Sequence, residues 1–246
     1  RLFKNKIMKN IDKNGVRKLK KVIAIIINSD IGLYNFRKEL LDRLLQEKYK
    51  VFILLPNGER IAELQSMGCI FYELPINRHG INPFEDLKIL IKIKRVLSYI
   101  KPDILLTYTI KPNIYGGIAA QILYIPYIVN ITGLGTAVEN PGILRFVTTK
   151  LYKIALRKAS CVFCQNQENL NFIKKLGTLK KIRLLPGSGV NLNNFSFQKY
   201  PDEQKTIFSF ISRIMKEKGI EQYLEAAEAI KVKYPNTEFH VCGFCE

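Results

Sequence analysis

Short apolar runs alternate with amphipathic segments over most of the chain. The continuous runs, rich in β-branched residues, are residues 21–27, 51–55, 104–107, 127–131 and 161–164. Such runs are typical of strands that are buried on both faces of a parallel sheet. The segments between them place apolar residues at helical spacing: residues 34–48, 83–100, 113–123 and 142–159. The alternation predicts an α/β fold, a Rossmann-like doubly wound parallel sheet built from βαβ units.

The pattern is interrupted at residues 191–205, which are polar and irregular. It then restarts with a strand, a helix and a second strand, and about 40 residues of this kind cannot bury a core of their own. We therefore expect four parts: a basic extension at residues 1–20, a complete Rossmann-like domain at 21–190, a linker at 191–205, and the first βαβ unit of a truncated second Rossmann-like domain at 206–246.

The chain is strongly basic, with 39 Lys and Arg against 21 Asp and Glu, a net charge of +18. Residues 1–20 hold 8 basic residues and 1 acidic residue, whereas residues 201–246 hold 6 and 8. A field of this sign attracts phosphates, nucleic acid or an anionic membrane. The net charge alone does not distinguish these three partners. The excess of positive charge lies in the first 200 residues, so we expect the anionic partner to bind there.

Several classes of protein are disfavoured. No run reaches the roughly 18 apolar residues of a membrane span, and residues 1–20 lack the apolar core of a signal peptide. The chain begins with Arg1, which leaves open a fragment or a natural start at Met8. Five cysteines, an odd number, favour a reducing cytoplasm. The GxGxxG and Walker motifs are absent, which disfavours NAD and ATP sites.

Candidate ligand-binding residues follow the predicted strands, because ligands of open parallel sheets bind at the carboxyl ends of the strands. Gly32 and the pair Gly133 and Gly135 are either glycines that let the backbone approach a ligand or plain turn residues. Arg213 and Lys218 flank a strand-to-helix turn, where cations beside a helix N-terminus would cradle a pyrophosphate; the alternative is two solvated charges.

Metal and acid–base chemistry receive little support from the sequence. Cys161 and Cys164 lie three apart on one predicted strand and point to opposite faces, so we expect no metal site there. The pair Cys242 and Cys245 follows the last strand with no helix after it, which disfavours redox chemistry. His79, in a loop, is a candidate for substrate contact.

Two predicted helices, residues 83–100 and 142–159, combine apolar positions with several Lys and Arg side chains. A basic amphipathic helix can lie on an anionic membrane. The alternative is a helix packed on the sheet with a solvated basic face. Nucleic-acid binding is less favoured, because the Tyr and Phe residues occupy core-like positions.

Five motifs in order resemble the retaining glycosyltransferases of family 4, which have the GT-B fold. They are Leu33-Tyr-Asn-Phe-Arg37, Thr109-Ile-Lys-Pro-Asn-Ile-Tyr-Gly-Gly117, Thr132-Gly-Leu-Gly135, Leu185-Pro-Gly-Ser-Gly-Val190 and the turn from Ser212 to Gly219. The resemblance covers residues 20–246 and is greatest to bacterial enzymes that extend polyprenyl-diphosphate-linked sugars in capsule, O-antigen or glycan assembly.

The resemblance implies a mechanism and a set of site residues. The C-terminal domain would bind a nucleotide sugar, usually a UDP-sugar, and Arg213 and Lys218 match the basic pair that stabilises the leaving diphosphate, so neither a metal nor a cofactor is expected. Gly32, Gly133 and Gly135 would lie near the donor. The acceptor, or its diphosphate, would contact residues of the first and fourth strand-to-helix loops: Tyr34, Asn35, Arg37, Lys111 and Asn113.

The family's two-glutamate donor motif would lie beyond Glu246, so we expect residues 1–246 alone to transfer little sugar. The expected partners are a nucleotide sugar, a polyprenyl-diphosphate-linked acceptor and an anionic membrane surface, with no nucleic acid. The expected location is cytoplasmic, peripheral on the inner face of the bacterial cytoplasmic membrane. The competing hypothesis is a non-catalytic basic Rossmann-like module that binds an anionic membrane or nucleic acid.

Overall fold

The computed structural model describes residues 21–77, 82–135, 138, 141–177, 181–199 and 205–244. The chain divides into two compact units, residues 1–190 and 191–246. Each unit is treated by itself. No helix within the described part of the chain is both long enough and apolar enough to cross a membrane.

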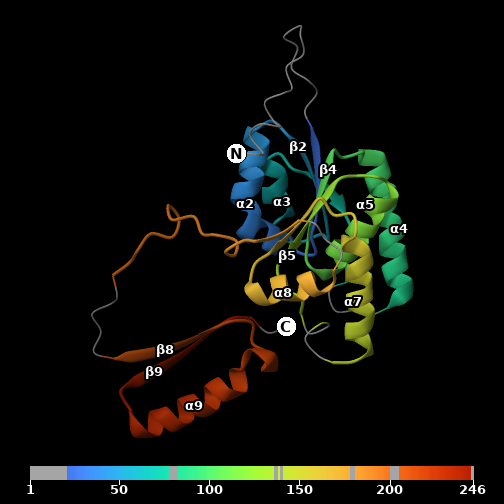
Figure 1. Cartoon of the computed structure of the whole chain (residues 1–246). Coiled ribbons are helices and arrows are strands. Elements are labelled where there is room, and N and C mark those ends of the chain that lie inside the picture. Colours follow the sequence, from blue (N-terminus) through green and yellow to red (C-terminus); the bar gives the residue numbers. More distant parts are fainter. Residues whose placement is uncertain are drawn as a thin grey trace. The chain divides into compact units, whose positions relative to one another are not determined.

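Unit 1 is built on a seven-stranded, fully parallel sheet with the order β3-β2-β1-β4-β5-β6-β7 (Figure 1). The strands are β1 Val22–Ile26, β2 Lys50–Leu55, β3 Ile70–Glu73, β4 Ile104–Tyr108, β5 Tyr127–Ile131, β6 Cys161–Cys164 and β7 Ile182–Leu184. The predicted doubly wound α/β fold is confirmed. The direction of strand addition reverses between β1 and β4, so their carboxyl ends form the switch point where open α/β sheets bind ligands.

Helices cover the two faces of this sheet unequally. Helices α2 (Asp30–Gln46) and α3 (Ile61–Ser66) pack on β1 and β2 to form one apolar cluster. The other face carries α4 (Pro83–Ile100), the single π-helical turn η1 (Pro112–Gly116), α5 (Gly117–Ile122), α7 (Ile143–Leu156) and α8 (Gln167–Lys175), which enclose a larger cluster. In Figure 1, α2 and α3 lie on one side of the strands, and α4, α5 and α7 on the other.

Among the described residues of unit 1, no helix covers β4, β5 and β6 on the α2 face. Ile104, Leu106, Ile128 and Phe163 project onto this face and are only half-buried, whereas alternate residues such as Val129 on the opposite face are fully buried. Alternation of this kind follows from the two-residue period of a strand. The open surface and α2 together form a groove of about 1040 Å³.

Unit 2 contains the predicted βαβ arrangement. Strands β8 (Thr206–Ile211) and β9 (Thr237–Cys242) pair in parallel, and the short 3₁₀ turn η2 (Lys216–Lys218) leads into α9 (Ile220–Lys233). The Tyr223 hydroxyl on α9 lies 3.0 Å from the Phe208 carbonyl oxygen and 2.9 Å from that of His240. Among its described residues, no hydrophobic side chain is buried, so this unit has no closed core.

Candidate functional site

The first loop of the site is shorter than the sequence predicts. Helix α2 begins at Asp30 rather than near Tyr34, because the Ser29 hydroxyl caps it by accepting the Gly32 amide at 3.0 Å. Gly32 therefore lies inside the first turn of the helix, and its expected position in a loop is wrong. A Cβ at Gly32 would approach Ser29 Cβ to 3.3 Å, so a glycine allows this tight cap.

The carboxylate of Asp30 holds two neighbouring loops together. It is buried and accepts the backbone N–H of Arg60 at 2.8 Å. A Cβ on Gly58 would lie 2.3 Å from Asp30 Oδ2, so the loop after β2 presses directly on this carboxylate. The start of α2 is thereby fixed against the loop that leads into α3.

Arg37 and Tyr108 meet at the switch point. Arg37 lies on α2, and its guanidinium carbon is 4.9 Å from the centre of the Tyr108 ring at the end of β4, within the range of a cation–π contact. Burial raises the pKa of Tyr108, and the nearby Arg37 charge opposes this rise. The structure thus places a cation beside a neutral phenol at the carboxyl ends of β1 and β4.

Tyr34 is held between two further cations. Lys38 Nζ lies 5.0 Å from the Tyr34 ring centre and donates a hydrogen bond to its hydroxyl at 3.3 Å, and the Arg60 guanidinium lies 5.4 Å away. Arg60 also forms an exposed ion pair with Glu63 at 2.7 Å. Asn35, the remaining candidate on this helix, is exposed. Tyr34 is therefore contacted by the cations Lys38 and Arg60, and the charge of Arg60 is balanced by Glu63.

Thr109 has a strained backbone at the end of β4. Its φ of 69° lies in the left-handed region, which a β-branched residue rarely adopts. The π-helical turn η1 follows at Pro112. Strained residues and π-helical turns both concentrate at functional sites. Sequence reasoning included Thr109 in a motif but gave it no role, because a positive φ at threonine has no signal in the sequence.

Lys111 is paired with an acidic residue of another element. Its ammonium lies 2.8 Å from Asp86 Oδ1 on α4, and both side chains are largely buried, at 17% and 15% exposure. Burial and the Asp86 carboxylate together raise the pKa of the neighbouring Tyr115. The charge of Lys111 is thus balanced inside the fold, away from Arg37. Neither Asp86 nor Tyr115 stands out in the sequence.

Asn113 is fully buried and links two strands. Its Nδ2 donates to the carbonyl of Asn130 at 3.0 Å, and Asn130 Nδ2 donates in turn to the carbonyl of Thr107 at 3.3 Å. Solvent does not reach Asn113 in this conformation. Of the expected acceptor residues, Tyr34 and Arg37 therefore lie together, whereas Lys111 and Asn113 support the backbone around Thr109.

The two glycines after β5 have different surroundings. Gly135 has a φ of 64°, and a Cβ there would lie 3.1 Å from Ile110 Cδ1, so this loop lies against the loop that follows β4. Among the described residues, no atom comes within 4 Å of a Cβ built on Gly133. The backbone at Gly133 is thus accessible at the carboxyl edge of the sheet.

The groove beside α2 ends at this edge in a polar patch. Its floor is formed by apolar residues of β4, β5 and β6, and its carboxyl end by Arg37, Tyr108, Gln165 and Ser188. Gln165 Nε2 donates to Ser188 Oγ at 3.3 Å, which connects the loop after β6 to the Gly187-Ser-Gly189 turn. Charged side chains also line the groove away from this end, namely Lys21, Glu39, Arg43, Glu47 and Asp103, so its apolar floor lies between two polar ends.

In unit 2, the two predicted donor-binding cations lie around one turn. Arg213 follows β8 and is half-buried, and Lys218 is exposed at the end of η2, just before Gly219 and the start of α9. A Cβ on Gly243 would lie 1.9 Å from Ser212 O, so the carboxyl ends of β8 and β9 approach closely beside this turn.

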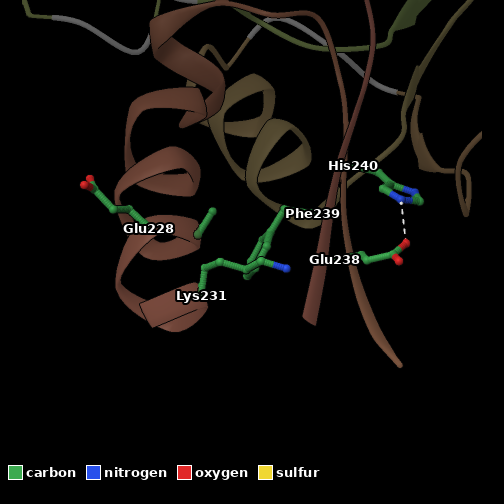
Figure 2. Close-up of a pocket in the computed structure, with 6 residues that line it drawn as sticks. Glu228, Lys231, Glu238, Phe239 and His240 are labelled. Atoms are coloured by element: carbon green, nitrogen blue, oxygen red, sulfur yellow. Dashed lines mark ion pairs between the residues drawn. The ribbon is translucent and has the colours of Figure 1, made fainter. Parts of the chain in front are cut away.

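Unit 2 has a hollow of about 490 Å³ that is lined by residues of α9 and β9 (Figure 2). Lys231 lines it and donates to the Thr237 carbonyl, and Glu238 Oε2 lies 3.4 Å from His240 Nε2. Figure 2 shows Glu228 directed away from this ion pair. Neither Arg213 nor Lys218 lines this hollow, so it is separate from the predicted donor site.

Metal ligands are not gathered anywhere in the described part of the chain, where no three His, Cys, Asp or Glu side chains form a cluster. Cys161 and Cys164 lie on opposite faces of β6, and burial raises the pKa of the Cys164 thiol to about 11. A thiol with this pKa is a poor nucleophile at neutral pH. His79 and Cys245 lie outside the described residues.

Known proteins share both sequence and fold with this chain. It is 27% identical over 230 residues to the N,N'-diacetylbacillosaminyl-diphospho-undecaprenol alpha-1,3-N-acetylgalactosaminyltransferase of Campylobacter jejuni, covering 86% of this chain and 61% of that protein. The chain therefore spans about three fifths of the length of this relative.

Two solved structures show the same fold at low sequence identity. The glycosyltransferase of Rickettsia africae matches with a TM-score of 0.63 at 18% identity, over 92% of this chain and 61% of that one. Anabaena Alr3699/HepE, solved with UDP and glucose, matches with a TM-score of 0.67 at 15% identity, over 92% and 62%. The family model for glycosyl transferase 4-like proteins matches residues 7–166, and the chain belongs to this family.

Proposed function

We propose that the protein transfers a hexose or an N-acetylhexosamine from a nucleotide sugar to a polyprenyl-diphosphate-linked glycan, in capsule, O-antigen or glycan biosynthesis. The observation that carries the proposal is the meeting of Arg37, Tyr108 and the strained Thr109 at the switch point of unit 1. Family membership supports transfer chemistry, and the Campylobacter jejuni relative is named for an undecaprenol-diphosphate acceptor.

In this proposal, unit 1 binds the acceptor. Arg37 supplies a positive charge that the acceptor diphosphate can contact, and Lys38, the next residue of α2, adds to the local potential. Lys111 and Asn113 act by holding the backbone after β4 in place. The open backbone at Gly133 gives the sugar of either substrate a place to approach.

Unit 2 would begin the donor site. The donor is a UDP-sugar in this proposal, and its diphosphate lies at the turn between β8 and α9, where Arg213 and Lys218 stabilise the negative charge of the departing nucleotide. These two cations replace a divalent metal in that role. The configuration at the anomeric carbon is retained, as in the enzymes that the motifs resemble.

The acceptor lipid determines where the reaction takes place. A polyprenyl diphosphate keeps its chain in the bilayer, so the enzyme must work at the membrane surface, and we place it on the inner face of the cytoplasmic membrane. Residues 1–246 alone would transfer little sugar, because unit 2 buries no hydrophobic side chain among its described residues and gains no packing energy from a closed core.

Transfer is tested with radiolabelled UDP-sugars and a detergent-dispersed polyprenyl-diphosphate sugar, followed by extraction of the lipid product. With the protein extended to the length of its relatives, we expect label from a UDP-sugar, but not from a GDP-sugar, in the lipid phase, and an NMR coupling constant that shows retention. Residues 1–246 should stay at background. Absence of label in the lipid phase with every nucleotide sugar would overturn the proposed function.

A further inference from the structure

Helix α7 carries apolar residues on two opposite faces. One face packs on the core through Thr148, Tyr152, Ala155 and Leu156, which are buried. The opposite face exposes Ile143 (84%), Phe146 (64%), Val147 and Ile154. These side chains follow one another at helical spacing and contribute nothing to the core. A second apolar stripe on the solvent side of a packed helix needs another explanation.

Helix α4 repeats the arrangement. Ile89, Ile93 and Leu97 are buried, whereas Phe84 (78%), Leu87 and Ile91 are exposed on the other side of the helix. Phe84 and Leu87 lie in the first turns of α4, as Ile143 and Phe146 do in α7. Ile91 and Tyr99 on α4 and Ile154 on α7 are exposed further along the helices. Isolated exposed apolar residues are ordinary, but a row of them on each of two helices of one layer marks an interaction surface.

The charges around these residues are mostly of one sign. Helix α7 contains Arg145, Lys150 and Lys153 and no acidic residue, and Lys150 Nζ lies 5.3 Å from the centre of the Phe146 ring. Helix α4 contains Lys88, Lys92, Lys94 and Arg95 against two acidic residues, of which Asp86 is already paired with Lys111. The exposed apolar rows are therefore surrounded by cations.

The two helices also begin at the same edge of the sheet as the candidate site. Each follows a parallel strand, so each starts at the carboxyl edge, and both pack on the same face of the sheet (Figure 1). Both helices also contact η1. The η1 turn follows Thr109 and Lys111 directly. The exposed first turns of α4 and α7 thus flank the segment that we assign to the acceptor.

We infer that the first turns of α4 and α7, with Phe84, Leu87, Ile143 and Phe146 as apolar contacts and Lys88 and Lys150 as cations, form a docking surface for an anionic phospholipid bilayer. Apolar side chains enter the headgroup region while lysines bind lipid phosphates, which is how amphipathic helices attach to membranes. The inference rests on the proposed function, because a lipid-linked acceptor would be presented at this surface.

Vesicle flotation tests the inference with the chain alone and no acceptor. The chain should float with phosphatidylcholine vesicles that contain phosphatidylglycerol and stay at the bottom with pure phosphatidylcholine. The variant K150E/K153E should lower the vesicle partition coefficient at least tenfold, since each surface lysine contributes about fivefold at an anionic membrane. I143S/F146S should lower it similarly, at low and at moderate salt.

The matched controls change equally exposed residues elsewhere. V232S on α9 removes an exposed apolar side chain, and K48E/K50E reverses two exposed lysines beside the amino end of β2; both should bind vesicles as the parent does. Equal flotation of all variants, no flotation of the parent, or tighter binding to RNA than to anionic vesicles would overturn the inference. Failure to bind a polyprenyl diphosphate, measured separately in solution, would instead count against the proposed function.

Discussion

At the scale of single residues, the backbone of Thr109 distinguishes the end of β4 from an ordinary strand end. We predict that Thr109→Gly changes the free energy of unfolding by less than about 0.5 kcal/mol, because relief of the left-handed strain offsets the greater freedom of glycine in the unfolded chain. Urea denaturation measures the change.

The control for this prediction is Thr107→Gly, two residues earlier and inside β4. Thr107 is fully buried in a regular strand conformation, so the substitution should cost about 2 kcal/mol or more through lost packing and added backbone entropy. Equal losses in the two variants would show that Thr109 is not strained. Sugar transfer by the T109G protein then reports whether the conformation also serves the reaction.

The sequence was sufficient to identify residues by type but not to place their side chains. Arg37 was predicted from a motif, and the structure places it beside Tyr108. Lys111 and Asn113 were predicted from the same reasoning, yet Lys111 pairs with Asp86, which lies 25 residues away, and Asn113 is buried against β5. Long-range partners of this kind leave no local signal, whereas the Ser29 cap follows a recognisable pattern of Ser followed by Asp.

At the scale of elements, the Lys111–Asp86 pair attaches α4 to the turn η1. We predict that Lys111→Met and Asp86→Asn each destabilise the protein by about 2–4 kcal/mol, because each leaves a largely buried charge without its partner. The double variant should be less destabilised than the sum of the two, by about 1–3 kcal/mol. A double-mutant cycle from urea unfolding checks this, and strictly additive losses would contradict the pairing.

Element boundaries were predicted well where local signals exist. Pro83 at the start of α4 and the apolar runs of β1 and β5 agree with the structure to within a residue or two. The predicted helix over residues 113–123 is instead a π-helical turn followed by α5. The spacing of hydrophobic residues cannot separate an α-helix from a π-helical turn, because the two differ only in which backbone groups pair. Here that pairing is imposed by packing against α4 and α7.

At the scale of the whole molecule, two substitutions in one strand can test whether the α2 face of unit 1 is open. Ile128 and Ile131 lie three apart on β5 and point to opposite faces, with Ile128 half-buried in the groove and Ile131 fully buried in the core. We predict a cost of about 1 kcal/mol for Ile128→Ala and about 3 kcal/mol for Ile131→Ala, because the cost follows the packing that is lost.

Thermal and urea unfolding of the two variants measure the difference. Comparable losses would mean that Ile128 is covered in solution by a segment or partner that packs on this face. The sequence could not predict which face is open, since β4, β5 and β6 have the continuous apolar pattern of strands buried on both sides. It did predict the parallel sheet itself, because that depends on the alternation of strands and helices rather than on any single contact.

The structure shows where the cations behind the net charge of +18 are concentrated. Cations of unit 1 gather at Tyr34 and Arg37 and on the solvent faces of α4 and α7, and unit 2 adds Arg213 and Lys218 at one turn. These three places correspond to an acceptor diphosphate, a membrane and a donor diphosphate in the proposed function. Of the three kinds of partner that charge alone left open, the proposed function includes phosphates, at two sites, and an anionic membrane, and it does not include nucleic acid.

The most direct test of this account is the binding of a soluble short-chain prenyl-diphosphate sugar to residues 1–246, measured by isothermal titration calorimetry. We predict that Arg37→Gln weakens binding at least tenfold, whereas Arg43→Gln, two turns further along α2 and paired with Glu47, leaves it unchanged. The matching prenyl alcohol, which lacks the diphosphate, should not bind measurably. Equal binding by the Arg37→Gln and Arg43→Gln variants, or equal binding of the alcohol, would contradict the assignment of this site to the acceptor.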